Sequence, residues 1–320
     1  MQKKISYQFL LLSIFQCIAA ISISQNLPTY EQYHFNQLVI NPAYAGSNGT
    51  LDVQAFIHTQ WTEMDGAPQT ESLSASTVVG DGRHGIGISF VHDNVGVSDK
   101  IQLKADYAFR MYMGKGVLAI GISAIANYTN WNYAELDAFQ DGDPAFTDVP
   151  ETSLTPNSGF GIWYSNPIMF TGLSIPVLVE NEDLAVIPNA DETINVYDAT
   201  RHYFYTLGFL IPISENFKLK PYTLAKYSFG SPVQIDGSLS MIFYDFLWVG
   251  GSYRTDKSIT LMAEYFLKKN NTLRSNTFGF GYAYNFRNDN TSALFGATHE
   301  VFISFNLDTH ITKFVNPRFF

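Results

Sequence analysis

The sequence predicts an all-β protein: a transmembrane antiparallel up-and-down β-barrel of about 14 strands, with short periplasmic turns and long acidic extracellular loops. Polar and apolar residues alternate with a period of two over runs of ten to twelve residues, close to the roughly 9–11 tilted residues that cross a bilayer. Aromatic residues make up 15% of the chain, and charged residues also only 15%, against a usual charged fraction of about 25%. Both observations favour strands with one face in lipid.

The alternation is clearest in residues 101–112. One face carries apolar side chains such as Leu103 and Tyr107, and the other carries Lys104 and Asp106. A soluble β-sandwich also alternates, but its strands are typically about five or six residues long. A soluble sandwich therefore remains an alternative, to be favoured if the protein is absent from the outer-membrane fraction.

Fourteen such segments follow one another along the chain. They are 52–61, 70–79, 85–92, 101–112, 117–128, 157–165, 168–175, 201–211, 217–228, 232–243, 246–254, 258–267, 276–286 and 299–307. An even number places both chain ends on the periplasmic side, so the odd-numbered connections are extracellular. These include 129–156, 176–200 and 287–298, whereas the even-numbered connections are mostly tight turns, the longest being 268–275.

The two longest predicted loops, 129–156 and 176–200, contain acidic residues but no lysine or arginine. Their negative field would attract a partner with a basic or polar surface. We therefore predict that these loops dock a partner, and that twelve of the 29 acidic residues of the chain take part. The twelve are Glu135, Asp137, Asp141, Asp143, Asp148, Glu151, Glu180, Glu182, Asp183, Asp191, Glu192 and Asp198.

The N-terminal region predicts three segments. Residues 1–24 have two lysines, a short apolar run and small residues at the end, which is typical of a secretory signal peptide. A membrane anchor is the alternative, but the run from about residue 9 to 21 is shorter than a spanning helix. Residues 25–49 form a periplasmic leader or plug segment, and residues 50–320 form the barrel. The single cysteine, Cys17, lies in the signal peptide, so no disulfide is expected.

Residues for catalysis, cofactor binding or metal binding are not indicated. None of the seven histidines has metal-ligand spacing, and Asp141-Gly142-Asp143 lacks the terminal glutamate of a calcium loop. Ser258, His202 and many acids are present, but no G-x-S-x-G frames a serine. The net charge of -10 argues against nucleic acid as a partner. We expect a protein that is not an enzyme and has no cofactor.

Several stretches carry a family resemblance. They include FNQLVINPAYAG at 35–46, TQW at 59–61, GAPQTESLSAST at 66–77 and RHYF at 201–204. With the further stretches 85–96, 159–179, 220–254, 299–307 and 316–320, they cover nearly the whole mature chain in order. The sequence closely resembles the PorP/SprF family of the type IX secretion system, found in Bacteroidota. The motif residues singled out, all expected to be structural, are Asn41, Pro42, Ala43, Tyr44, Ala45, Gly46, Trp61, Gly66, Pro68, Arg201 and His202.

Within NPAYAG, Asn-Pro and the closing glycine predict a bend. We expect this bend at the inner rim of the barrel, where the leader could tuck under or into the lumen. The following strand would then present Val53, Ala55, Ile57 and Trp61 to lipid.

The resemblance implies an integral outer-membrane barrel without catalytic residues. Such a barrel supports the export and surface attachment of specific proteins with type IX C-terminal sorting domains, including a gliding adhesin in some members. Its implied partners are outer-membrane lipid, those secreted proteins and other type IX components. The alternative is a porin or small-solute channel, because fourteen strands allow an open lumen. Lys104, Asp106, Arg110, Lys220 and Lys226 would either line such a pore or pair across it.

Overall fold

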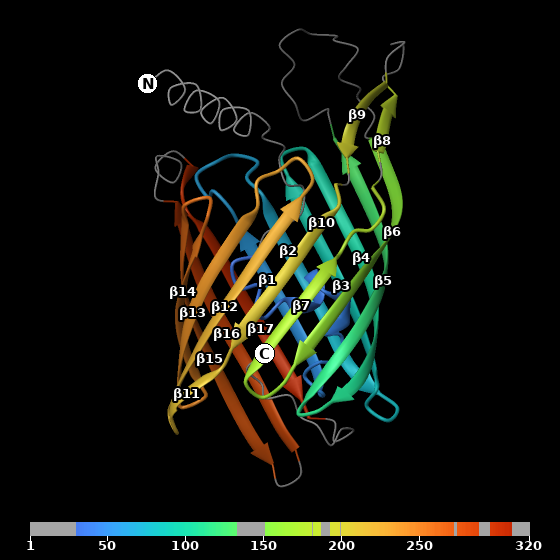
Figure 1. Cartoon of the computed structure of the whole chain (residues 1–320). Helices are drawn as coiled ribbons and strands as arrows, with labels where there is room; N and C mark the ends of the chain where they lie inside the picture. Colours follow the sequence, from blue (N-terminus) through green and yellow to red (C-terminus); the bar gives the residue numbers. More distant parts are fainter. Residues whose placement is uncertain are drawn as a thin grey trace, which may run out of the picture.

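The structure is a computed structural model that describes residues 30–132, 151–180, 182–186, 193–198, 200–271, 274–287 and 295–308. The signal peptide predicted for residues 1–24 lies outside them. Fourteen strands close into one antiparallel barrel (Figure 1), in which the last strand pairs with the first from Leu51↔Leu307 to Thr59↔His299. Among the described residues, no helix is long and apolar enough to cross a membrane.

The fourteen predicted strands are confirmed, thirteen of them within four residues of their expected bounds, while the strand predicted at 157–165 begins six residues earlier, at Glu151. The barrel strands are β1 (Leu51–Thr59), β2 (Gln69–Val79), β3 (His84–Val95), β4 (Ser98–Met113), β5 (Gly116–Trp131), β6 (Glu151–Ser165), β7 (Met169–Ile175), β10 (His202–Phe209), β12 (Phe217–Ser228), β13 (Gln234–Phe243), β14 (Leu247–Arg254), β15 (Ser258–Asn271), β16 (Arg274–Arg287) and β17 (Thr298–Leu307).

Three connections differ from the sequence prediction. The predicted loop 176–200 contains a two-stranded hairpin, β8 (Glu182–Val186) with β9 (Thr193–Asp198). The short strand β11 (Ile211–Ser214) pairs with the start of β12. The predicted turn 268–275 is largely ladder, because β15 and β16 stay paired as far as Asn271↔Arg274. Backbone pairing continues past the point where the hydrophobic alternation ends, so the alternation underestimates strand length.

The connections sort onto two ends of the barrel. We call the end with the β1–β2, β3–β4, β5–β6 and β7–β10 connections the loop end, and the end with the β2–β3, β4–β5 and β6–β7 connections the turn end. The wide gaps in the ladder, 132–150 and 176–201, both fall at the loop end, although the β3–β4 connection at that end is only residues 96–97. The three named connections at the turn end are all short. This separation agrees with the predicted topology.

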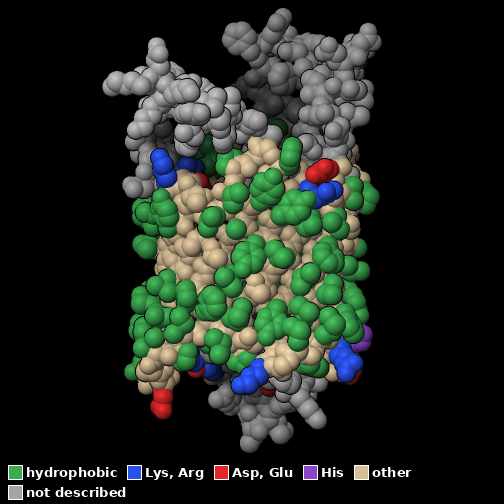
Figure 2. Space-filling view, viewed as in Figure 1, with side chains coloured by type: hydrophobic (Ala, Val, Ile, Leu, Met, Phe, Trp, Pro, Cys, Tyr) green, Lys and Arg blue, Asp and Glu red, His purple; other side chains and the backbone are tan. Residues whose placement is uncertain are grey.

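The outer wall is apolar and the inner wall polar. In β4, Leu103 and Tyr107 are 50% and 41% exposed, whereas Lys104 and Asp106 are 1% and 5% exposed. Figure 2 shows hydrophobic side chains over the middle of the visible face and charged ones toward its two ends. In β1, Ile57 is exposed and Val53 and Ala55 are partly exposed on the same outer face, as predicted. Trp61 was expected to continue this face, but it lies two residues past the end of the strand. The outer surface therefore suits a bilayer.

The leader, residues 30–50, lies inside the barrel. All of it is buried except Phe35, Val39 and Asn48, which are partly buried. It includes α2 (Gln37–Ile40) and η1 (Pro42–Tyr44). The NPAYAG bend was expected at the inner rim, but it lies within the lumen against β3, β5, β6 and β7, because glycines on those strands leave room for it.

The leader passes through the lumen from one end to the other. Tyr30 lies near Phe56, close to the loop end of β1, while residue 50 joins the other end of that strand. The described chain thus begins at the loop end and finishes with Asp308 at the turn end. The prediction that both termini are periplasmic concerns chain ends outside the described residues.

Candidate functional site: the occupied lumen

Asn41 holds the lower leader, residues 37–50, against the barrel wall. The Asn41 side chain accepts a hydrogen bond from the Ala43 amide (2.9 Å), which caps η1, and it donates to the carbonyls of Ile162 (3.1 Å) and Leu173 (3.4 Å). Pro42 stands at the first position of η1, where its missing N–H costs nothing. One asparagine thus shapes the bend and ties it to two strands.

A floor of lumenal glycines lies beneath NPAYAG. A Cβ on Gly85 would overlap the Ala45 carbonyl, one on Gly121 the backbone of Ala43, and one on Gly161 the Asn41 side chain. These glycines come from β3, β5 and β6. Their lack of side chains lets the leader backbone approach the barrel wall closely.

The wall also supplies donors for carbonyl groups of the lower leader. Lys104 Nζ donates to the carbonyls of Leu38 (2.6 Å) and Val39 (3.0 Å) and lies 3.3 Å from Asp106 Oδ1. Ser174 Oγ donates to the Ile40 carbonyl at 2.6 Å. Lys104 and Asp106 pair with each other along the same strand, β4, and not across the lumen as one of the two open alternatives had it. Because the pair is buried, losing one member would leave an uncompensated charge.

The upper leader, residues 30–36, meets a different wall. Glu31 Oε2 accepts hydrogen bonds from Arg254 Nη2 (3.2 Å), Thr260 Oγ1 (2.7 Å) and Asn285 Nδ2 (3.0 Å). The two carboxylate oxygens of Glu300 accept from the backbone amides of Glu31 and Gln32, each at 2.8 Å. We call these four wall residues the Glu31 socket.

An aromatic cluster fills the lumen between the two halves of the leader. Phe35 stacks on Phe302 with ring centroids 4.7 Å apart, and lies 5.4 Å from Trp248 and 5.7 Å from Phe266. The amine of Lys220 is 5.1 Å from the Trp248 ring, a cation–π distance. Lys220 therefore faces rings and does not line an open pore.

Sequence reasoning missed these inward-facing rings. They interrupt the alternation, as in Val301-Phe302-Ile303 and Leu247-Trp248-Val249, where three apolar residues follow one another. Such triplets place an apolar side chain on both faces of a strand. This signal could have indicated a lumen that holds an apolar segment.

Several buried polar groups around the upper leader have no hydrogen-bond partner among the described residues. They are the side-chain atoms of Gln32 and His34 and both carboxylate oxygens of Glu264. His34 Nε2 is 4.0 Å from Glu264 Oε1, beyond hydrogen-bond distance. Since buried polar groups normally find partners, the contact between the upper leader and the wall is poorly satisfied.

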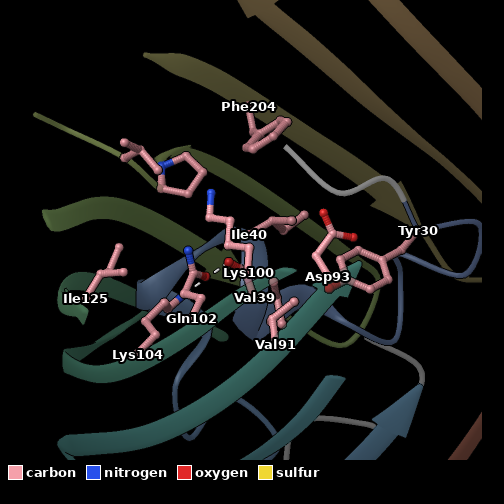
Figure 3. A pocket seen from close by; sticks show the side chains of 12 residues that line it. Tyr30, Val39, Ile40, Val91, Asp93, Lys100, Gln102, Lys104, Ile125 and Phe204 are labelled. Atoms are coloured by element: carbon pink, nitrogen blue, oxygen red, sulfur yellow. Dashed lines mark hydrogen bonds between the residues drawn. The ribbon is translucent and has the colours of Figure 1, made fainter. Parts of the chain in front are cut away.

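A hollow lies beside the leader, toward the loop end. Its empty volume is about 590 Å³, a figure that includes open solvent at its mouth. Figure 3 shows Val91, Ile125 and Phe204 around Val39 and Ile40 of the leader, with Tyr30 at one side. Lys100, Gln102 and Lys104 of β4 also line it. The leader thus occupies one side of the upper lumen and leaves space on the other.

The other predicted motif residues lie at the loop end and do not form one site with NPAYAG. Trp61 lies 6.2 Å from Phe295 between ring centroids, and the Gly66 and Pro68 carbonyls accept from the amides of Gly96 and Gln60 at 2.9 Å. Two other motif residues hold the β7–β10 connection: Arg201 donates to the Leu178 carbonyl (2.7 and 3.0 Å), and His202 Nδ1 is hydrogen-bonded to the Thr200 carbonyl (2.8 Å).

Five of the twelve predicted docking acids lie among the described residues. Glu180 is exposed just after β7. For Glu151, Glu182, Asp183 and Asp198 the backbone alone is described, in β6, β8 and β9. The remaining seven, Glu135, Asp137, Asp141, Asp143, Asp148, Asp191 and Glu192, lie outside the described residues. Within the part of the chain that is described, no group of three histidine, cysteine or acidic side chains could hold a metal ion.

A closed barrel with an apolar outer band and a lumen occupied by its own leader is an integral outer-membrane barrel of the plugged kind. Residues 22–305 match the model of a family described as type IX secretion system membrane protein PorP/SprF. This chain belongs to that family, and the resemblance predicted from the motifs is confirmed. No curated protein matches the chain at a significant level.

Solved structures share the barrel fold at low identity. A Pseudomonas aeruginosa FadL homologue is 10% identical, with 83% of this chain and 92% of that chain covered and a TM-score of 0.45. The CymD monoaromatic hydrocarbon channel is 11% identical, with 85% and 91% covered and a TM-score of 0.48. The outer membrane protein Omp33 of Acinetobacter baumannii is 9% identical, with 81% and 97% covered and a TM-score of 0.42.

Proposed function

We propose that this protein is a non-enzymatic component of the type IX secretion system in the outer membrane. It supports the export and surface attachment of specific proteins with C-terminal sorting domains, a gliding adhesin being one candidate. The observation that carries this proposal, together with family membership, is the leader: residues 30–50 occupy the lumen and are bonded to both sides of the wall. Such a barrel serves better as a docking platform than as an open pore.

In this proposal the loop end faces outward and meets the secreted protein, and the turn end meets periplasmic components. The acidic residues predicted for the two longest loops would steer a basic or polar surface toward the barrel and speed encounter more than they raise affinity. Neutralising the acids of both loops should therefore slow surface attachment. Unchanged attachment of the cargo in that variant would count against docking through these loops.

Deletion of the gene, followed by proteomics of the cell surface and the secretome, tests the proposal. Loss of one or a few sorting-domain proteins would assign a dedicated role, and loss of all of them a role in the core apparatus. If every sorting-domain protein is still exported and attached, the proposal is wrong.

Conductance measurements distinguish the proposed function from the alternative, a porin or small-solute channel. A lumen filled by the leader should give no steady current in a planar bilayer, because the bonded segment stands in the ion path. Steady open-channel current from the unaltered protein would instead favour the channel. The hollow beside the leader makes this measurement informative, since it leaves part of the upper lumen unfilled.

A further inference from the structure

The Glu31 socket has the properties of a peptide-binding site. Its donors to the carboxylate, Arg254, Thr260 and Asn285, come from three different strands and are 6%, 1% and 6% exposed. We propose that this socket binds an acidic peptide segment of a partner protein, and that the leader occupies it in cis as an internal substitute. The proposal does not depend on the export role proposed above.

The socket recognises main chain as well as side chain. Glu300, which is 0% exposed, accepts from two successive backbone amides, and His58 Nδ1 lies 3.0 Å from the same carboxylate. Any polypeptide that presents an acidic residue and two free successive N–H groups can satisfy these acceptors and donors. Charge-assisted hydrogen bonds of this kind are about twice as strong as neutral ones.

Aromatic sites on the wall flank the socket. Rings of the leader lie against rings of the wall: Tyr30 is 6.2 Å from Phe56, and Tyr33 is 5.5 Å from Tyr222, between ring centroids. Phe35 follows against Phe302. These sites select large apolar side chains on either side of the acidic residue. The ligand class is thus a short peptide with one acidic residue between aromatic residues.

The upper leader can leave without unfolding the barrel. It contains no helix, the polar atoms of Gln32 and His34 lack partners among the described residues, and the hollow offers space beside it. The socket also tolerates being emptied of the leader, because Arg254 Nη2 keeps Asp236 Oδ2 at 3.0 Å. The buried guanidinium therefore stays paired, which avoids the large cost of a lone buried charge.

The test is peptide binding to the full-length protein in detergent, measured by fluorescence anisotropy. The probe is a labelled synthetic peptide with the sequence of residues 29–37, TYEQYHFNQ. In the unaltered protein the tethered leader competes at millimolar effective concentration, so binding should be weak. The Glu31→Ala variant, whose leader is weakened, should bind the peptide at least about 10-fold more tightly.

Two controls sharpen this result. A peptide in which the glutamate is replaced by glutamine should bind Glu31→Ala about 10-fold more weakly than the acidic peptide. The Asp245→Ala variant removes the partner of Lys218 at the turn end and should behave like the unaltered protein. A folded Glu31→Ala barrel that does not bind the peptide, or that binds both peptides equally, overturns the proposal.

If the Glu31→Ala variant does not fold, amide hydrogen exchange of the unaltered protein tests whether the upper leader can leave the socket. The upper leader should exchange faster than residues 38–46, because local opening needs only the socket and the aromatic contacts to break. Equally slow exchange in both halves overturns the proposal. Neither measurement reports export, so their failure leaves the proposed function untouched, whereas normal export after gene deletion would affect that function alone.

Discussion

The two halves of the leader cross the same lumen but are held by different interactions. The lower leader is held by shape: its backbone lies on lumenal glycines, and Lys104 donates to two of its carbonyls, although the Gln37 side chain has no partner among the described residues. The upper leader is held by charge and aromatic rings, with polar atoms of Gln32 and His34 left without partners among the described residues. Close packing is hard to undo locally, whereas a charged contact beside free space can open.

The comparison predicts a separation of roles. The lower leader should be needed for the barrel to fold, and the upper leader should open while the barrel stays intact. Unfolding in lipid vesicles with urea, followed by the fluorescence of the four tryptophans, measures the first property. Amide exchange measures the second.

The largest loss of stability is expected for Lys104→Met, in the wall residue that binds the lower leader. The substitution leaves the Leu38 and Val39 carbonyls without this donor and Asp106 without its counter-charge. Breaking a buried pair in this way costs about 3–5 kcal/mol, so the urea midpoint should fall strongly. The double variant Lys104→Met/Asp106→Asn removes the lone charge and should recover part of the loss. No recovery would mean that the leader carbonyls, and not the charge, carry the effect.

The Phe35→Ala variant tests how firmly the upper leader is held. Removing the ring from its stack with Phe302, Trp248 and Phe266 should weaken the upper leader by about 3 kcal/mol. By that figure, amide exchange in residues 30–36 should rise roughly 100-fold, while the urea midpoint of the barrel stays nearly unchanged. A large drop in the midpoint would show that the two halves form one cooperative unit, and the distinction drawn between them would fail.

The barrel was predictable from sequence because lipid imposes a strict rule. One face of every strand must be apolar, and a slip of one residue would turn that face inward. Fourteen strands could therefore be counted from alternation alone. Strand ends beyond the lipid obey no such rule, which is why β15 and β16 extend past the predicted turn to Asn271 and Arg274.

The path of the leader was much harder to predict. Residues 30–50 are short, mixed in polarity and without a strand or helix period, so their burial follows only from what the wall offers. The wall's glycines, its inward rings and its buried Glu300 are far apart in the sequence and meet only on closure of the barrel. The bend in NPAYAG was correctly expected, but its depth in the lumen was not.

Gly121→Val tests the glycine floor with a smaller expected effect. A Cβ on Gly121 would overlap the backbone of Ala43, and such overpacking typically costs about 1–3 kcal/mol. The matched control is Gly237→Val, since a Cβ on Gly237 would have no atom within 4 Å and β-branched residues suit strands. Heat-modifiable gel mobility should show less folded Gly121→Val and a normal amount of the control. Equal amounts would mean that the leader can shift off the floor.

The smallest loss of stability is expected for Asn41→Ala, at the first residue of the NPAYAG motif. Its side chain caps η1 and donates to two strand carbonyls. Since Ile162 and Leu173 are paired with each other in the β6–β7 ladder, the main loss is the cap, about 1 kcal/mol. The urea midpoint should fall slightly, and Asn41→Ser, whose hydroxyl can still cap η1, should recover most of the loss. If Asn41→Ala folds normally but cargo attachment is lost, the motif contacts a partner, and the structural role assigned to it is wrong.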